Sequence, residues 1–375
     1  MGHAFNAKEE VYRALAERLN KNPVGVPVNE GLMEILHCLY TESEALVGSK
    51  FPLLPMPFDK IAGLTGLAGQ ELQGILESMA NKGLLLDLER RDSTYYMLSP
   101  MVVGFFEYTF MRVRDSVNMK ELAELFESYF QRAEVRNEFF GADTQLFRTL
   151  AYESLIPSLV ETEVLEYERA SQIIRQSNGG ALSMCSCRHK ASHLDKACNG
   201  PLDVCTSFGD AANWLIRRGM GKPATVDELL RVLDQTEKLG LVHLGDNVLN
   251  KPAYICHCCG CCCLVLRSIK ESGKKAIHPS NFLPVLKQNN CIGCGICAES
   301  CHIQALTMGV DEIGMGMADT ELFPSLNQEI CIGCGVCASV CPTQALTMSQ
   351  RSILHIPPAN KREQFTRIFR EKGRR

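Results

Sequence analysis

The sequence predicts a multidomain protein of the α+β class. Its 375 residues exceed the usual size of one domain, and 46% of them are hydrophobic, enough for substantial cores. Helical periodicity dominates the first half, whereas residues 289–348 contain a repeat with short strand patterns. The 19 cysteines are unevenly placed: one precedes Cys185, ten lie from Cys185 to Cys263, and eight lie from Cys291 to Cys341. Such local groups favour metal or redox sites over a disulfide scaffold.

The N-terminal third is expected to contain a helix in residues 1–28 and a small mixed domain in residues 29–112. From residue 29 to 99 the pattern is three helices followed by a hairpin. The expected helices are residues 32–39, 58–64 and 70–82, and the expected strands are residues 84–88 and 94–98. This order resembles a winged-helix domain, with the third helix in the recognition position and the hairpin as the wing.

The charge of this winged-helix-like domain disfavours DNA as a partner. Residues 29–99 contain ten acidic and five basic side chains, a net charge of −5. The third helix carries Glu71 and Glu77 against Lys82, and only the wing tip, Arg90 and Arg91, is basic. DNA binding needs several lysine or arginine contacts to phosphates.

The middle of the chain is expected to be a helical connector, residues 113–180, followed by a cysteine-rich region, residues 181–280. One amphipathic stretch of the connector includes Leu159 and Val164. In the cysteine-rich region, Trp214 is expected to lie in the core of its helix, with Arg217 and Arg218 exposed.

A repeat occupies residues 281–350. CIGCGICAESCHIQALTM, which begins at Cys291, aligns with CIGCGVCASVCPTQALTM, which begins at Cys331. Both read C-x2-C-x2-C-x3-C, which wraps three thiolates around one site in a tight loop. The glycines of each loop allow positive φ and a close approach of the backbone, and short strands are expected after each motif, at residues 305–308 and 345–348.

The repeat resembles the bacterial two-cluster ferredoxin, in which the fourth cysteine of each motif ligates the other cluster. The resemblance implies two [4Fe–4S] clusters, one held by Cys291, Cys294, Cys297 and Cys341, the other by Cys331, Cys334, Cys337 and Cys301. The two motifs differ after their fourth cysteine: Pro342 follows Cys341, whereas His302 follows Cys301. Paired zinc sites are the alternative, because C-x2-C pairs also bind Zn²⁺.

The first upstream group is Cys185, Cys187, Cys198 and Cys205, spaced C-x-C-x10-C-x6-C. Four thiolates suffice for one more cluster, beside which Arg188, His189 and Lys190 would place positive charge. A zinc site or reduced buried thiols are the alternatives.

The second upstream group has six cysteines within eight residues: Cys256, Cys258, Cys259, Cys261, Cys262 and Cys263. Six thiols exceed the four ligands of one cube. The two additional thiols could be spare, could ligate a site shared with the Cys185 group, or could belong to a bridged cluster. The alternative is that they form a reactive thiol pair. Gly260 is expected to permit a sharp turn. His257 is not assigned as a ligand.

Other cofactor motifs are missing from the sequence. It contains no C-x3-C-x2-C, no G-x-G-x-x-G after a strand, no P-loop, no G-x-S-x-G and no H-E-x-x-H. No flavin or nicotinamide site is therefore expected. The N-terminus lacks a secretory pattern and no apolar stretch reaches the roughly 18 residues of a membrane span, so we expect a cytoplasmic protein. Residues 351–375 form a basic C-terminal tail, and its part from Lys361 to Arg375 is expected to be a solvated helix end or a floppy tail; a docking site for an acidic partner or a membrane surface is the alternative.

Three functions are compatible with these features. The first is an electron-transfer protein or oxidoreductase subunit that exchanges single electrons with a redox partner protein, the winged-helix-like domain serving for docking. The second is a redox-sensing transcriptional regulator with the clusters as sensors. The third is an enzyme that uses thiols of residues 256–263. The combination resembles multi-cluster iron–sulfur proteins of anaerobic bacteria and archaea, which implies electron transfer, and we favour the first function.

Overall fold

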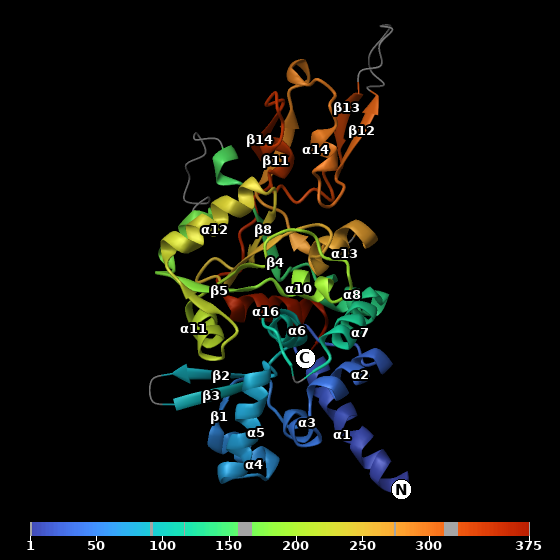
Figure 1. The fold of residues 1–375 in the computed structure, drawn as a ribbon, viewed down its shortest axis with the longest axis vertical. Coiled ribbons are helices and arrows are strands. Elements are labelled where there is room, and N and C mark those ends of the chain that lie inside the picture. Colours follow the sequence, from blue (N-terminus) through green and yellow to red (C-terminus); the bar gives the residue numbers. More distant parts are fainter. Residues whose placement is uncertain are drawn as a thin grey trace.

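The N-terminal region consists of five helices and a small sheet. In the computed structural model (Figure 1), the structure describes residues 2–90, 93–115, 117–156, 167–273, 275–310 and 322–374. The helices are α1 (Gly2–Asn20), α2 (Glu30–Leu39), α3 (Glu42–Ser49), α4 (Phe58–Thr65) and α5 (Gly69–Lys82). The strands β1 (Met56–Pro57), β2 (Leu85–Arg90) and β3 (Ser93–Leu98) form an antiparallel sheet in the order β1-β3-β2.

The three helices and the hairpin expected in residues 29–99 are present, together with α3, which was not expected. Its start carries a capping box: Thr41 Oγ1 accepts from the Glu44 amide, and the Glu44 side chain accepts from the Thr41 amide. Gly66 and Gly83 end α4 and α5 in the left-handed conformation. Arg91 of the expected wing tip lies outside the described residues.

The N-terminal region packs on the cysteine-rich region through one buried carboxylate. Asp87 accepts hydrogen bonds from Trp214 Nε1 at 2.8 Å and Arg218 Nη2 at 2.7 Å, and also bonds Arg217. Burial opposes ionisation, but the bonds from Arg218 and Trp214 outweigh it and lower the pKa of Asp87. Trp214 is buried as predicted. The prediction that Arg218 is exposed is wrong, because it is enclosed between Asp87 and Glu77 with 9% of its side chain exposed.

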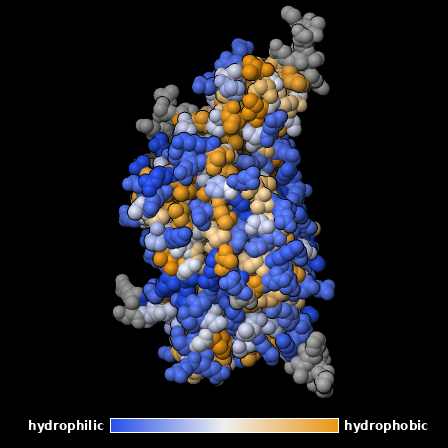
Figure 2. All heavy atoms as spheres, in the orientation of Figure 1, coloured by the Kyte–Doolittle hydropathy of each residue, from blue (hydrophilic) through white to orange (hydrophobic). Residues whose placement is uncertain are grey.

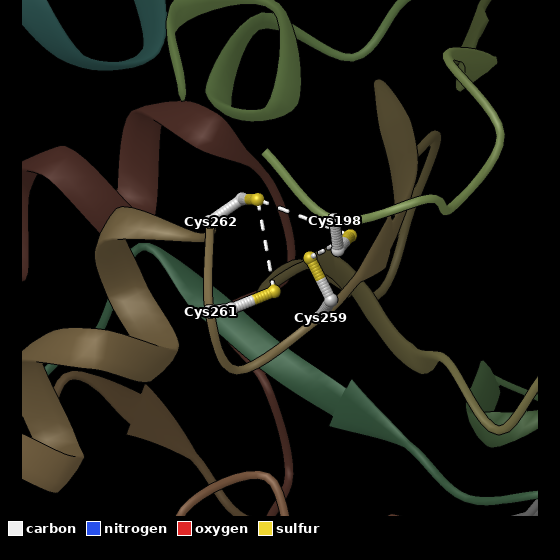
Figure 3. Close-up of side chains that lie close together, drawn as sticks. All are labelled: Cys198, Cys259, Cys261 and Cys262. Atoms are coloured by element: carbon white, nitrogen blue, oxygen red, sulfur yellow. Dashed lines mark hydrogen bonds between the residues drawn. The ribbon is translucent and has the colours of Figure 1, made fainter. Parts of the chain in front are cut away.

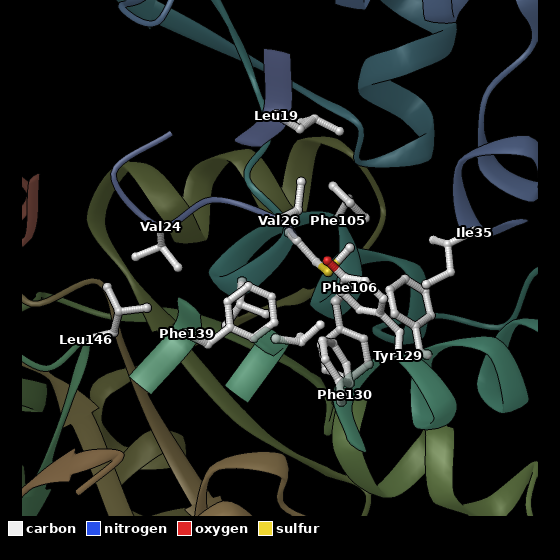
Figure 4. Close-up of a cluster of buried hydrophobic side chains, with 14 of the residues drawn as sticks. Leu19, Val24, Val26, Ile35, Phe105, Phe106, Tyr129, Phe130, Phe139 and Leu146 are labelled. Carbon is white, nitrogen blue, oxygen red and sulfur yellow. The ribbon is translucent and has the colours of Figure 1, made fainter. Parts of the chain in front are cut away.

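An aromatic core is formed by α6 (Phe106–Phe110), which precedes the connector, and by the first helices of the connector (Figure 4). The rings of Phe106 and Phe130 meet edge to face with centroids 4.9 Å apart, and Phe139 packs on Phe130 at 5.7 Å. These rings come from α6, α7 (Met119–Gln131) and α8 (Ala133–Phe140). Leu159 and Val164 lie outside the described residues.

A seven-stranded sheet forms the centre of the molecule, in the order β10-β4-β8-β9-β6-β5-β7. Its strands are β4 (Phe147–Leu150), β5 (Gly180–Met184), β6 (Asp203–Phe208), β7 (Lys222–Ala224), β8 (Val242–Asp246), β9 (Tyr254–Cys258) and β10 (Ile277–His278). Only the β10–β4 pair is parallel. Because β4 belongs to the connector, that segment is not purely helical: it supplies a fully buried strand.

Helices cover both faces of this sheet. On one face α9 (Ala170–Gln176) and α12 (Val226–Lys238) bury apolar side chains against Phe208 and Ile255. On the other lie α10 (Ser186–Ser192), α11 (Gly209–Arg217) and α13 (Leu264–Ser272), with α6 beside α10. This second face carries the upstream cysteines. No helix among the described residues has the length and apolar character to cross a membrane.

The C-terminal repeat projects from one end of the molecule (Figure 1). It contains two antiparallel pairs: β11 (Phe282–Leu286) with β14 (Leu346–Gln350), and β12 (Leu306–Val310) with β13 (Leu322–Leu326). The strands expected after each motif correspond to β12 and β14, and the short helices are α14 (Ile296–Glu299) and α15 (Val336–Ser339). The chain enters and leaves the repeat at one point, where the rings of His278 and His355 stack with centroids 3.2 Å apart.

The expectation of a solvated C-terminal tail is wrong. Helix α16 (Lys361–Glu371) returns to the body of the molecule, where Gln364 and Ile368, one turn apart, are buried. Beyond it, Lys372 and Arg374 both pair with Glu138 of α8. Basic residues that a charge count assigns to solvent are therefore part of the packing.

Candidate metal centres

The structure gathers the cysteines of the repeat into two groups of four. Cys291, Cys294, Cys297 and Cys341 line one cavity of about 20 Å³, which we call the outer site. Cys301, Cys331, Cys334 and Cys337 line a second cavity of about 20 Å³, the inner site. In both sites the fourth cysteine comes from the other motif, as the ferredoxin resemblance implies.

The glycines of the two loops are required by close backbone contacts. Gly293 and Gly333 have φ of 66° and 67°, and Gly295 and Gly335 also have positive φ. A Cβ atom at Gly293 would lie 2.9 Å from the Leu322 carbonyl oxygen, and one at Gly333 would lie 2.1 Å from that of Phe282. The loops therefore bring backbone close around each set of thiols, which suits the tight wrapping of a cluster.

The cysteines of the inner site are on the whole more buried than those of the outer site, which reaches the surface at Cys294. Cys331 and Cys337 are each 8% exposed, and the cavity they line is also bordered by Val242 of β8. Burial raises the pKa of Cys334 to about 12. In the outer site Cys294 is exposed, and the neighbouring Ile292 is 67% exposed. Four soft thiol ligands per cavity fit iron–sulfur clusters at both sites.

Four of the upstream cysteines form a compact group: Cys198, Cys259, Cys261 and Cys262 (Figure 3). All four sulfur atoms lie within 4.8 Å of one another. The Sγ–Sγ distances are 3.5 Å between Cys198 and Cys259, 3.7 Å between Cys261 and Cys262, and 3.9 Å between Cys198 and Cys262. Three of these residues belong to the turn between β9 and α13, and Cys198 comes from the loop between α10 and β6.

The other six upstream cysteines line a cavity of about 50 Å³, which we call the thiol chamber and which Cys259 and Cys262 of the compact group also border. The six are Cys185, Cys187, Cys205, Cys256, Cys258 and Cys263. Side chains alternate along a strand, so Cys256 and Cys258 of β9 share one face. The pairing of Thr206 with Ile255 places Cys205 of β6 beside Cys256. Hydrogen bonds from Cys205 and Cys258 lower the pKa of Cys256 to about 5.

Two helices supply the remaining wall of the thiol chamber. Cys185 immediately precedes α10 and Cys187 lies in its first turn, while Cys263 immediately precedes α13. Glu127 of α7 joins these helices by accepting hydrogen bonds from Lys190 of α10 and from Arg267 of α13, the latter at 2.7 Å. No local sequence pattern indicates this role of Glu127, because its partners lie 63 and 140 residues away.

The expectation that Cys185, Cys187, Cys198 and Cys205 share one site is therefore wrong. Cys198 joins the compact group, and the other three face the thiol chamber. The physical reason is that Cys205 is fixed by the pairing of β6 in the sheet, whereas Cys198 lies in the preceding loop and is free to reach the Cys259 turn. Spacing along the chain does not show which side of a sheet a residue faces.

Only one of the three basic residues after Cys187 lies at the sulfur atoms. Arg188 is buried, lines the thiol chamber and approaches Cys259 Sγ with Nη2 at 3.5 Å. His189 Nδ1 instead lies 2.7 Å from the Phe110 carbonyl oxygen, and Lys190 pairs with Glu127. Of the three residues expected to place charge beside these thiols, only Arg188 lies there, because consecutive helical residues point in different directions.

The two histidines near the cysteines have other partners. His257 faces the opposite side of β9, where its Nδ1 lies 2.8 Å from Thr236 Oγ1. His302 Nε2 donates to the Gly240 carbonyl oxygen at 2.7 Å. Gly260 lies in a turn as expected, but its φ is not positive. Glycine is required there for another reason, because a Cβ atom would lie 2.3 Å from the His302 carbonyl oxygen.

Comparison with known proteins agrees with the geometry of the repeat. Residues 290–345 match the family model of the 4Fe-4S dicluster domain. No curated protein and no solved structure matches the chain. The match and the two four-cysteine cavities together support iron–sulfur binding by this region. The chain therefore carries a C-terminal ferredoxin-type domain with the pattern of two [4Fe–4S] clusters.

Proposed function

We propose that the protein is an iron–sulfur electron-transfer component that exchanges single electrons with a partner oxidoreductase. The observation that carries the proposal is the crossed pair of four-cysteine cavities in residues 290–345. In this proposal Cys291, Cys294, Cys297 and Cys341 hold one [4Fe–4S] cluster, and Cys301, Cys331, Cys334 and Cys337 hold the other. Each bound cluster supplies a one-electron redox couple.

The placement of the two sites supports an electron path that runs between the protein surface at the outer site and the interior at the inner site. The outer site opens to the surface at Cys294, and exposed apolar side chains lie beside it at Ile292 and Ile296. Figure 2 shows hydrophobic residues on the surface of the C-terminal repeat, at the top of the view. Apolar surface near a redox site suits the docking of a partner protein. The inner site borders Val242 of β8, whose register partner on β9 is Cys258 of the thiol chamber. The ten upstream cysteines are proposed as further metal ligands along this route.

The winged-helix-like region is proposed as a structural docking unit. On the expected recognition helix, α5, the side chains of Glu77 and Asn81 bind Arg218, which immediately follows α11. These contacts occupy polar side chains of α5, and residues 29–99 have a net charge of −5. The helix therefore offers few basic groups to DNA phosphates. The transcriptional regulator therefore has no specific structural observation in its favour.

Iron and acid-labile sulfide analysis with EPR on anaerobically purified protein tests the proposal. We expect at least about eight Fe per chain, since two cubes contribute four each. Cys341→Ser should remove the EPR signal of one reduced cluster and Cys301→Ser that of the other. Cys38→Ser, a substitution in α2 far from both motifs, is the control and should change neither. Zinc in place of iron at the repeat, or loss of the same signal in both variants, would contradict the proposal.

A further inference from the structure

The compact group has the dimensions of a site for one metal ion. A tetrahedral ion with metal–sulfur bonds of about 2.3 Å separates its sulfur ligands by about 3.8 Å. Three Sγ–Sγ distances among Cys198, Cys259, Cys261 and Cys262 are 3.5, 3.7 and 3.9 Å, and all pairs lie within 4.8 Å. The spacing of the four thiols thus matches that of the ligands of one tetrahedral ion.

The outer and inner sites provide an internal comparison. Among the described residues, which include all eight of their cysteines, no three of these sulfur atoms lie within 4.8 Å of one another. A cube needs that wider arrangement, because each thiolate binds a different iron at its own corner. The chain thus contains four-cysteine groups of two geometries. The outer and inner sites have the wide sulfur spacing that a cluster needs, whereas the sulfur atoms of the compact group are too close together for one.

The thiol chamber departs from both. Eight cysteines line its cavity of about 50 Å³, which compares with about 20 Å³ in each ferredoxin-type site. Two of them, Cys259 and Cys262, belong to the compact group, and the other six still exceed the four ligands of a cube. The six residues surround the cavity from β6, β9 and the starts of α10 and α13. Both the ligand number and the volume exceed the requirement of a single cube.

The surroundings of the chamber favour metal over free thiolates. Its other walls include the apolar side chains of Val102, Phe106 and Leu244, and its cationic wall residue is Arg188. One guanidinium cannot balance several thiolates in an apolar enclosure, where an unpaired charge is costly. Iron ions provide the missing positive charge.

We propose that the ten upstream cysteines form two metal sites of different kinds. Cys198, Cys259, Cys261 and Cys262 hold one tetrahedral ion, zinc or iron, and the six cysteines of the thiol chamber hold one iron–sulfur cluster with more iron than a cube. The second half rests on the proposed electron-transfer function, whereas the first does not. Arg188, hydrogen-bonded to Cys259, stands between the two sites.

The proposal is tested by counting metal and acid-labile sulfide in matched cysteine variants of the full chain. Cys198 and Cys261 do not line the chamber, and Cys187 and Cys205 do not belong to the compact group. We expect Cys261→Ser and Cys198→Ser each to lose one ion per chain with sulfide unchanged. We expect Cys187→Ser and Cys205→Ser to lose more than about four Fe with a similar amount of sulfide. Cys38→Ser is the control.

The identity of the lost ion separates the two sources. Loss of zinc indicates a structural site, and loss of a mononuclear high-spin ferric EPR signal indicates iron. Loss of about four Fe and four sulfides from Cys261→Ser would overturn the single-ion site. Because Cys261 is exposed, that variant leaves the core packing unchanged. Unchanged iron and sulfide in Cys187→Ser and Cys205→Ser would overturn the chamber site. If instead Cys341→Ser and Cys301→Ser change nothing, the proposed ferredoxin function fails, whatever the upstream variants show.

Discussion

The amide of Gly260 donates a hydrogen bond to Nδ1 of His302 at 3.2 Å. Because Nδ1 accepts here, the proton of the neutral ring lies on Nε2, which donates to Gly240. Gly260 is flanked by Cys259 and Cys261 of the compact group, and His302 follows Cys301 of the inner site. The histidine that replaces the expected proline thus joins two neighbouring sets of thiols.

Gly260→Ala should weaken the contact between the repeat and the β9–α13 turn. The new Cβ atom would lie 2.3 Å from the His302 carbonyl oxygen, so the backbones must separate. We expect the free energy of unfolding to fall by about 1–3 kcal/mol, the usual cost of overpacking, measured by urea denaturation. Gly74→Ala in α5 is the control, because no atom lies near its added methyl group and stability should be unchanged or higher. Equal stability of the two variants would show that the contact is not tight.

His302→Ala removes both hydrogen bonds of the ring while leaving all cysteines in place. We expect a loss of about 1–3 kcal/mol in unfolding free energy. Iron and sulfide contents should stay unchanged, and reduction of the upstream metal through the repeat, followed by freeze-quench EPR, should be slower. Pro342→Ala, at the equivalent position of the second motif, is the matched control. A variant that lost the inner cluster would instead assign the histidine to ligation.

Asp87→Ala should loosen the N-terminal region from the cysteine-rich region. The substitution leaves Trp214 Nε1 without its acceptor and Arg218 with only its α5 partners. We expect a loss of about 2–4 kcal/mol, in the range for breaking a buried pair but reduced because Arg218 keeps Glu77. Glu89→Ala is the control: its carboxylate is 66% exposed and lies 3.4 Å from Arg217, so less than about 1 kcal/mol should be lost. Limited proteolysis between the regions provides a second measurement.

Glu127→Gln should reduce stability in a way that depends on pH. Burial opposes ionisation, but hydrogen bonds from Arg267 and Lys190 lower the pKa of Glu127 to about 2, against 4.5 in the unfolded chain. A depressed carboxyl pKa stabilises the fold above pH 4.5, and this contribution disappears as the pH falls from 4.5 to 2. At neutral pH we expect the variant to be less stable by about 1–3 kcal/mol, allowing for solvent screening.

The measurement compares the unfolding free energies of wild type and variant at about pH 7 and about pH 4. The difference should shrink at the lower pH. Glu124→Gln, exposed on the same helix, is the control. A difference that stayed constant with pH would mean that Glu127 acts through packing and not through its charge.

The ferredoxin-type cysteines could be predicted because each motif is local. Three thiols of every site lie within seven residues, and the offset of 40 residues identifies the partner motif. The sorting of the upstream cysteines depends on the sheet instead. Whether Cys205 and Cys256 face the same cavity follows from the register of β6 and β9, which no local spacing determines. The sequence therefore shows each cysteine motif but not which upstream cysteines meet in space.

The remaining errors have the same origin. Arg218 is basic and near a helix end, which favours solvent, yet Asp87 lies 131 residues away in sequence and meets it in space. The segment after residue 351 is basic, yet Glu138 of α8 neutralises Lys372 and Arg374. Charge composition describes a segment, whereas burial depends on a partner elsewhere in the chain.

The stacked rings of His278 and His355 have a consequence for how the chain is assembled. The strand before the repeat and the helix after it belong to one body, so the ferredoxin-type region is an insertion and not an appendage. A module whose two ends meet can be exchanged for a short linker without rethreading the central sheet. The ferredoxin-type region thus meets the scaffold at the paired imidazoles of His278 and His355, and again where His302 contacts Gly260.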